Sequence, residues 1–376
     1  MSSRDFVRAL PSSDRLATSR RLVALHLDPV LLLAIAAIIG FGLVVLNSAV
    51  DGARSLFNAQ LVRMGLAVVT MIVIAQFSPR FYLRWSPVAY VLGVATLAAV
   101  LAFGVTVKGS QRWLDLPGLP RFQPSEIMKL AVPLMVAWYL NDRPLPPNLR
   151  HVGGALVIIA IPAGLIAVQP DLGTAILVAA AGFGVVVLSG IYWRWMGLAV
   201  LGLAMAAPGL WFVMKDYQRQ RVLTLFDPES DPLGAGWNII QSKTAIGSGG
   251  VFGKGLFQGT QSHLEFLPES KTDFIIAVVG EELGLVGVAS LLLLYLVVIA
   301  RGLYIATQVQ HTFGRLLVGG LVLTFFVYVF VNIAMVSGLL PVVGVPLPLV
   351  SYGGTSAITL MAGFGIVMSV HTHRGW

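Results

Sequence analysis

The sequence predicts an all-α polytopic membrane protein with about ten transmembrane helices, and three observations carry this prediction. Of its 376 residues, 57% are hydrophobic and only 11% are charged, whereas soluble domains are roughly 25% charged. The mean hydropathy is +0.84. Long apolar stretches also follow one another along almost the whole chain. A soluble protein of this length would need many more polar residues to cover its surface.

Each apolar stretch is expected to be a helix, because inside a bilayer the backbone groups can bond only within their own segment. Most stretches approach the ~20 residues with which a helix crosses the hydrocarbon. The predicted spans are 29–49, 60–76, 87–106, 126–140, 152–168, 172–190, 193–213, 273–300, 315–338 and 353–370.

The positions of arginine orient the predicted bundle. Along the chain, short connections that contain arginine alternate with short connections that lack it. The second group contains a single arginine, Arg54. By the positive-inside rule the arginine-containing side is cytoplasmic. Both termini are therefore predicted to be cytoplasmic, as tails at 1–28 and 371–376 that flank a transmembrane domain at 29–370.

Two predicted outer connections are basic in spite of this rule; long loops are partly exempt from it, so a function is expected for the charges of the shorter one. One is the loop at 107–124. The other, at 214–272 between helices 7 and 8, is about 59 residues long. A loop of that length is either functional or disordered, and its aromatic residues argue against disorder.

Several function classes are excluded by composition and spacing. The formal charge of +8 is scattered between the spans instead of forming the stripe that binds nucleic acid. There is no cysteine, hence no disulfide and no cysteine nucleophile. The glycine-rich stretch near Lys254 fails as a P-loop, because Ser248 and Gly255 stand where glycine and serine or threonine are required. His371 and His373 are expected to be solvated.

Charged residues inside predicted spans are candidates for function because their burial in lipid is costly. Pro124 and Ser125 predict a helix start, with Ser125 as N-cap. Glu126 and Lys129 then lie three residues apart on one face and can pair. The pair either fixes helix packing or has a direct or gating role in function, and the sequence leaves both open.

A second candidate lies where the large loop meets the eighth helix. Thr272 is the expected N-cap, which places Asp273 in the first turn at the outer membrane boundary, where the helix dipole and Lys271 favour its ionised form. Acidic residues in first turns are also common as simple helix stabilisers. Glu281 and Glu282 follow two to three turns deeper and need partners that the sequence does not name.

Basic residues in the outer loops are candidates for binding an anionic group. Arg112 beside Trp113 suits a phosphate or a sugar ring, although the two side chains could equally anchor the loop at the interface. The other basic candidates are Lys108, Arg219, Arg221 and Lys243. The prolines and glycines at 341–354 indicate irregular backbone that faces a cavity or protein.

Five segments in order resemble the SEDS family of bacterial cell-wall growth, and its RodA branch more than its FtsW branch. These segments are 122–129, 169–174, 247–250, 267–284 and 346–354. The resemblance covers nearly the whole chain beyond the N-terminal tail. The run at 259–267 and the form of 169–174 favour RodA.

The resemblance implies a peptidoglycan glycosyltransferase of the bacterial cytoplasmic membrane that polymerises lipid II through β-1,4 bonds at the outer face during elongation. It makes Asp273 the essential residue, either as general base or as the ligand of a divalent cation, Mg²⁺ or Mn²⁺, that screens the leaving pyrophosphate. Glu269 and Ser351, inside the matched segments, are expected substrate contacts. A class B penicillin-binding protein is the expected partner.

Two rival functions fit parts of the same pattern. A lipid II flippase would also place charges and broken helices in the membrane, but it should line a path through the whole bilayer, and here the polar residues gather in the outer half. Glu281 and Glu282 are the exception to that grouping. A non-catalytic scaffold for cell-wall enzymes is the second rival.

Overall fold

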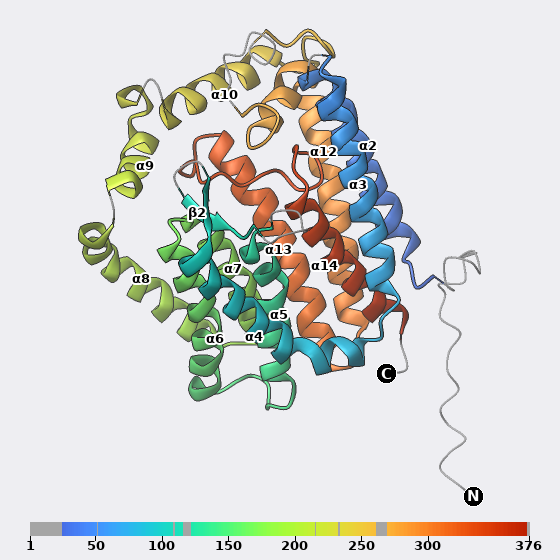
Figure 1. Cartoon of the computed structure of the whole chain (residues 1–376), viewed down its shortest axis with the longest axis vertical. Coiled ribbons are helices and arrows are strands. Elements are labelled where there is room, and N and C mark those ends of the chain that lie inside the picture. The colour runs from blue at the N-terminus through green and yellow to red at the C-terminus, as the bar shows by residue number, and fades with distance from the viewer. Residues whose placement is uncertain are drawn as a thin grey trace, which may run out of the picture.

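The computed structural model describes residues 25–50, 52–107, 110–115, 122–214, 216–231, 234–260 and 269–373. Each predicted span corresponds to a helix (Figure 1). These helices are α2 (Pro29–Ala49), α3 (Arg54–Ala75), α4 (Pro79–Phe103), α5 (Pro124–Asn141), α6 (Leu149–Val168), α7 (Leu172–Leu188), α8 (Trp193–Val213), α12 (Ile275–Gln308), α13 (Thr312–Val336) and α14 (Thr355–Thr372).

Seven of these helices are long and apolar enough to cross a membrane, namely α2, α3, α4, α6, α12, α13 and α14. The chain is therefore a multi-pass membrane protein. The remaining three predicted spans correspond to α5, which carries Glu126 and Lys129, to α7 with 17 residues, and to α8. For these three, a complete crossing stays a prediction.

Helix starts follow the local sequence, although two of the predicted caps are wrong. Asp28 caps α2 by accepting a hydrogen bond from the Leu31 backbone N–H at 2.8 Å, ahead of Pro29. Ser125 is not an N-cap, because α5 begins at Pro124, after Gln123, and the Ser125 hydroxyl is buried without a hydrogen-bond partner.

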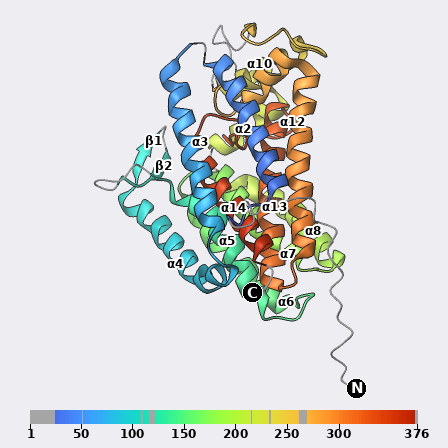
Figure 2. The ribbon, with the colours of Figure 1, turned by 90° about the vertical axis from the view of Figure 1, so that its right-hand side faces the viewer.

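The centre of the bundle is α13, which packs against α5, α7, α12 and α14 (Figures 1 and 2). In the most apolar windows of α13 and α14, 67% and 61% of the residues are buried, against 22% in α3 and 28% in α4. The poorly buried apolar faces of the outer helices are those that lipid covers. The polar residues that matter chemically therefore have to lie on the inward faces, around α13.

The two ends of the described chain meet at one end of the bundle. The imidazole rings of His26 and His373 stack with their centroids 3.9 Å apart. His371 lies 3.4 Å from the Asp28 carboxylate, which also pairs with Arg301 at 2.6 Å. His371 is 9% exposed, so the expectation that it is solvated is wrong.

The large loop is folded where it is described, in agreement with its aromatic composition. It contains α9 (Asp216–Phe226), the 3-10 turn η1 (Pro228–Ser230) and α10 (Ala235–Gly249). These elements lie at the end of the bundle away from the C-terminus (Figure 1). α10 packs against the start of α12, which connects the loop to the helix that follows Asp273.

A break at Gly284 divides α12, with φ at 64°. Backbone N–H groups of Lys254 and Gly255 donate to the carbonyls of Glu281 and Glu282, and the N–H of Leu285 donates to Gly250. The loop that follows α10 is thereby joined to both sides of the break. A Cβ atom placed on Gly284 would lie 2.4 Å from the backbone nitrogen of Gly253, so a side chain there would collide with it.

This junction supplies the partners that the sequence left open for the two glutamates. Glu281, fully buried, accepts hydrogen bonds from the Lys254 ammonium at 2.7 Å and from the Thr260 N–H at 2.7 Å. Glu282, equally buried, accepts one from the Ser48 hydroxyl at 2.7 Å. The two glutamates thus fasten the large loop to α12 and α2.

Candidate active site

A polar cavity of about 180 Å³ lies where three helices begin. Its wall includes the first turns of α5, α7 and α14, together with α13, the irregular segment 344–346 and strand β2 (Ser110–Trp113). β2 pairs with β1 (Val105–Val107) in a hairpin beside the end of α4 (Figure 2). Because helix N-termini carry partial positive charge, three of them converging on one cavity favour an anion there.

Asp273 lies beside this cavity, one residue before the N-cap of α12. The helix begins at Ile275 with Phe274 as N-cap, so the expected position of Asp273 in the first turn, with Thr272 as cap, is wrong. The Thr272 hydroxyl instead donates to the Glu269 carboxylate at 2.7 Å. A Cβ atom placed on Gly344, a residue of the cavity wall, would lie 3.5 Å from Oδ2 of Asp273.

Asn332 on α13 fixes this arrangement, and the sequence analysis missed it. Its side-chain amide donates to the carbonyl oxygen of Asp273 at 2.8 Å and to that of Val345 at 2.6 Å. Asn332 is fully buried. A polar amide inside the predicted span 315–338 was the available signal, because an amide, like an ionisable group, is costly to bury in a membrane without partners.

Ser351 also joins the segment before α12 to the irregular segment that contains Val345. Its hydroxyl donates to the carbonyl oxygen of Thr272 and accepts from the N–H of Leu347 at 2.8 Å. The N–H of Tyr352 donates to the carbonyl oxygen of Lys271 at 2.8 Å. Ser351 is 4% exposed, and its role as a substrate contact stays a prediction.

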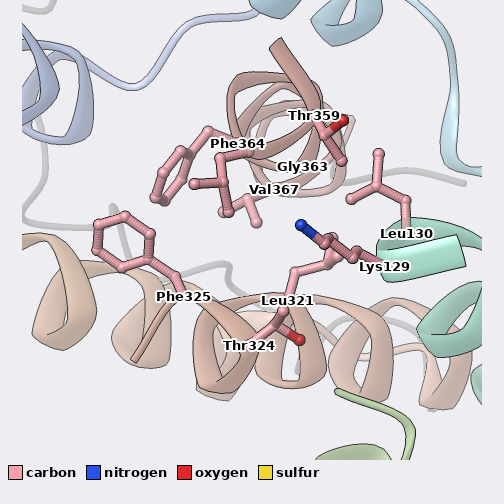
Figure 3. Close-up of a pocket in the computed structure, with 10 residues that line it drawn as sticks. Lys129, Leu130, Leu321, Thr324, Phe325, Thr359, Gly363, Phe364 and Val367 are labelled. Atoms are coloured by element: carbon pink, nitrogen blue, oxygen red, sulfur yellow. The ribbon is translucent and has the colours of Figure 1, made fainter. Parts of the chain in front are cut away.

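Glu126 and Lys129 form the buried ion pair that their spacing predicts, with Nζ and Oε1 2.5 Å apart. The Lys129 ammonium lies 4.8 Å from the centre of the Tyr328 ring, a cation–π distance. Both members of the pair line the polar cavity, as does Tyr328. Lys129 also reaches a small apolar cavity of about 20 Å³ between α13 and α14 (Figure 3).

Arg112 is bound to the turn that precedes α7. Its guanidinium donates to the carbonyl oxygen of Pro170 at 2.7 Å and lies 3.5 Å from the Asp171 carboxylate. Asp171 also caps α7 by accepting from the Thr174 N–H at 3.2 Å. Arg112 and Trp113 both line the cavity. Their position is therefore compatible with anchoring the loop and with binding a ligand.

A second cavity, of about 280 Å³ and mostly apolar, adjoins the polar one. It is lined by residues of α7, α9, α13 and the segment 340–343, and Leu177 belongs to the walls of both cavities. Arg221 and Gln218 are polar members of its lining. A polar chamber beside an apolar one fits a molecule with a charged headgroup and a hydrocarbon chain.

The other predicted binding residues do not gather around the polar cavity. Arg219 donates to the carbonyl oxygens of Trp211 and Phe212 at 2.9 and 2.8 Å, at the end of α8. Lys243 is exposed beside Gly338, and Glu269 is exposed with φ at 58°. Lys108 lies outside the described residues.

The comparisons with known proteins agree with this architecture. A family model described as "Cell cycle protein", for FtsW, RodA and SpoVE, matches residues 25–375. The chain belongs to this family. It is 59% identical over 350 residues to the peptidoglycan glycosyltransferase MrdB of Escherichia coli K12, covering 93% of this chain and 94% of the relative. It is 36% identical to a probable peptidoglycan glycosyltransferase FtsW of Trichlorobacter lovleyi, covering 91% and 92%.

Solved structures also resemble this FtsW/RodA/SpoVE family member over most of its length. One belongs to a study of the structural coordination of polymerization and crosslinking by a peptidoglycan synthase complex, with TM-score 0.82, 33% identity, and coverage of 93% of this chain and 98% of that chain. The rod shape determining protein RodA of Thermus thermophilus gives TM-score 0.71 and 30% identity at the same coverage. The predicted RodA branch is confirmed by this RodA neighbour and by the lower identity to FtsW, which is 36% against 59% for MrdB.

The described residues contain no group of three His, Asp or Glu side chains that could together hold a metal ion. Asp273 would therefore need oxygen atoms from a bound ligand to complete a cation site. Mg²⁺ is often held in this way, by one or two carboxylates and the phosphates of a substrate. The donor set is compatible with a cation that arrives with a pyrophosphate.

Proposed function

We propose that this chain is a peptidoglycan glycosyltransferase that polymerises lipid II at the periplasmic or outer face of the bacterial cytoplasmic membrane, with Asp273 at the reacting centre. The position of Asp273 beside a polar cavity onto which three helix N-termini converge carries this proposal. Peptidoglycan glycosyltransferase is also the activity by which the relatives MrdB and FtsW are named.

The two adjoining cavities fit the two halves of such a substrate. The polar cavity receives the pyrophosphate and the sugar next to it, since helix dipoles and the N–H groups of first turns stabilise phosphate oxygens. The apolar cavity, which shares Leu177 with it, receives the first part of the polyprenyl chain. Burial of the chain there is favourable through removal of apolar surface from water.

The reaction is one displacement that inverts the anomeric carbon. The acceptor hydroxyl attacks that carbon, the bond to the pyrophosphate oxygen breaks, and the β-1,4 bond forms while undecaprenyl pyrophosphate leaves. Asp273 accepts the proton of the attacking hydroxyl, as a general base. Asn332 and Ser351 are positioning residues, because they hold the backbone around Asp273 through its own carbonyl and that of Thr272.

A divalent cation is the alternative role for the same carboxylate. Bound by Asp273 and the pyrophosphate, Mg²⁺ or Mn²⁺ would supply electrostatic stabilisation of the leaving group. We further propose that a class B penicillin-binding protein is the partner, in keeping with a structural neighbour studied for polymerization and crosslinking in one complex. The end of the bundle where His26 and His373 stack faces the cytoplasm under this proposal.

The test is polymerisation of purified lipid II by the complex with its transpeptidase partner, comparing wild type with Asp273→Ala and Asp273→Asn. Both variants should make no glycan polymer while keeping wild-type thermal stability and partner binding. Asp216→Asn is the matched control, because Asp216 is a fully exposed carboxylate at the start of α9. Polymer from Asp273→Ala at the wild-type rate would reject the catalytic role, and no polymer from wild type would favour a flippase or a scaffold.

A further inference from the structure

Arg63 is a cation inside a membrane helix, and the site described above does not use it. It is the tenth residue of α3, so it lies about 14 Å along the helix axis from the outer end at a rise of 1.5 Å per residue. Such a depth is costly for a charge, which marks Arg63 as a candidate for function.

The surroundings of Arg63 leave its charge uncompensated. Its guanidinium carbon lies 4.7 Å from the centre of the Tyr352 ring. Within the described part of the chain, its five N–H donors have no hydrogen-bond acceptor and no carboxylate within ion-pair distance. An aromatic face attracts the charge but accepts none of these hydrogen bonds in the plane of the guanidinium.

Arg63 lies against the start of α14. A Cβ atom placed on Gly354, the N-cap of α14, would lie 3.0 Å from Cδ of Arg63 and 3.4 Å from its Nε. The positive end of the helix dipole thus meets a second positive charge, which is unfavourable unless an anion lies between or beside them. Gly353 and Gly354 both line the polar cavity, and neither has a side chain to separate Arg63 from it.

The other cations of that cavity are already neutralised by the protein. Lys129 pairs with Glu126, and Arg112 lies 3.5 Å from Asp171. In addition, the hydroxyl of Tyr328, a residue that is 1% exposed and lines the same cavity, has no hydrogen-bond partner. The cavity therefore offers an unused donor on one wall and an uncompensated cation at its edge.

Gln60, one turn before Arg63 on the same face of α3, fixes the loop that Arg63 contacts. Its amide nitrogen donates to the carbonyl oxygen of Ser351 at 3.2 Å, and its amide oxygen accepts from the N–H of Gly353 at 3.2 Å. Tyr352 lies between these two residues, and its backbone N–H donates to the carbonyl oxygen of Lys271, two positions before Asp273. Arg63 is thus joined through a short chain of contacts to the segment that carries the reacting carboxylate.

We propose that Arg63, with the start of α14, binds the phosphate oxygens of the polyprenyl pyrophosphate, both in the donor and after it has left. This inference rests on the proposed glycosyltransferase function and adds a binding residue to it. Arginine suits the role because its planar donors match two phosphate oxygens at once.

The test measures direct binding of undecaprenyl pyrophosphate to the full chain with its partner, in nanodiscs of neutral phosphatidylcholine. Arg63→Gln should weaken binding about tenfold or more, the size expected for a lost charge-assisted hydrogen bond. Arg63→Lys should restore part of the affinity, and the KM for lipid II should rise more than kcat falls. Arg54→Ala is the matched control, an exposed arginine at the outer end of the same helix, and it should bind like wild type.

Three results would overturn the inference. One is wild-type affinity in Arg63→Gln, and another is an equal loss of affinity in Arg54→Ala, which would indicate a general surface effect. The third is displacement of undecaprenyl pyrophosphate by phosphatidylglycerol vesicles at equal lipid phosphate, which would indicate a site for anionic lipid headgroups. Polymerisation by the wild-type complex, measured in parallel, tests the proposed function separately: a polymerising wild type with an unaffected Arg63→Gln rejects only the role of Arg63.

Discussion

The side-chain amide of Asn332 donates to the carbonyl oxygen of Asp273 at 2.8 Å, so the residue that precedes α12 is held in place by α13. The same amide nitrogen donates to the carbonyl oxygen of Val345, a residue of the cavity wall, at 2.6 Å. One buried side chain thus joins the segment that carries Asp273 to a residue of the cavity wall. The position of Asp273 depends on this contact more than on any capping interaction of its own helix.

Replacing Asn332 with leucine should lower both stability and turnover. The change leaves two carbonyl groups without their donor in a buried place, at about 1–3 kcal/mol for each unsatisfied group. We expect a lower Tm and at least a tenfold lower kcat for lipid II polymerisation, since Asp273 loses its support. Thr324→Val on the same helix is the control, because among the described residues that hydroxyl bonds only within α13, to the carbonyl oxygen of Gly320 at 2.8 Å. Wild-type turnover in Asn332→Leu would contradict the positioning role.

The Glu126–Lys129 pair should behave as a buried ion pair in a double-mutant cycle. Lys129→Met leaves the Glu126 charge buried and unpaired, which costs about 3–5 kcal/mol. Glu126→Gln combined with Lys129→Met removes both charges and should recover most of the lost stability in thermal unfolding. Because both side chains line the polar cavity, the stable double variant should still polymerise at least tenfold more slowly. A double variant no more stable than Lys129→Met would show that the two charges do not compensate each other.

Gly344→Ala should reduce polymerisation through a contact with Asp273. The φ of Gly344 is 75°, and the added Cβ would lie in van der Waals contact with the Asp273 carboxylate oxygen, at 3.5 Å, where it would occupy space that a substrate hydroxyl needs. Gly52→Ala has the same backbone strain, with φ at 80°, but open space around the new atom. Each substitution should cost about 1–2 kcal/mol for the left-handed backbone. Only Gly344→Ala should lose activity as well, and equal activities in the two variants would reject the contact.

The histidine stack near the termini should make stability depend on pH. Burial and the nearby charge of His373 hold the pKa of His26 below its usual 6.5. The unfolded chain therefore binds a proton more readily, so the stabilisation is present above about pH 6.5 and is lost as the pH falls below it. Wild type should show a lower Tm at pH 5.5 than at pH 8.

His26→Phe should reduce that difference in Tm, because phenylalanine keeps a ring for the stack with His373 and does not titrate. His151→Phe, at the start of α6 and away from the stack, serves as the control. An unchanged pH dependence in His26→Phe would assign the effect to other groups. Thermal unfolding of the two variants and wild type in one detergent at both pH values decides the matter.

Local patterns in the sequence predicted the elements well and some of their ends poorly. The predicted spans 29–49 and 193–213 coincide with α2 and α8. Ser125 and Thr272 looked like caps because serine and threonine favour that position, yet Gln123 and Phe274 occupy it. The Thr272 hydroxyl bonds Glu269 instead, since the tight turn before α12 brings that carboxylate within reach. Capping propensity is a preference of about 1 kcal/mol that such contacts override.

The sequence by itself determined the membrane class, the helices that occupy the predicted spans and the Glu126–Lys129 pair, and it singled out Asp273 as a candidate, because hydropathy, helical spacing and family motifs are local properties of the chain. Only the tertiary structure decided that Asn332 holds Asp273, that Lys254 and Ser48 satisfy the buried glutamates, and that Arg63 lies against the start of α14. These contacts join residues from 27 to 291 positions apart. The partners depend on how the helices pack around α13, and the periodicity of residues along one helix does not predict that packing.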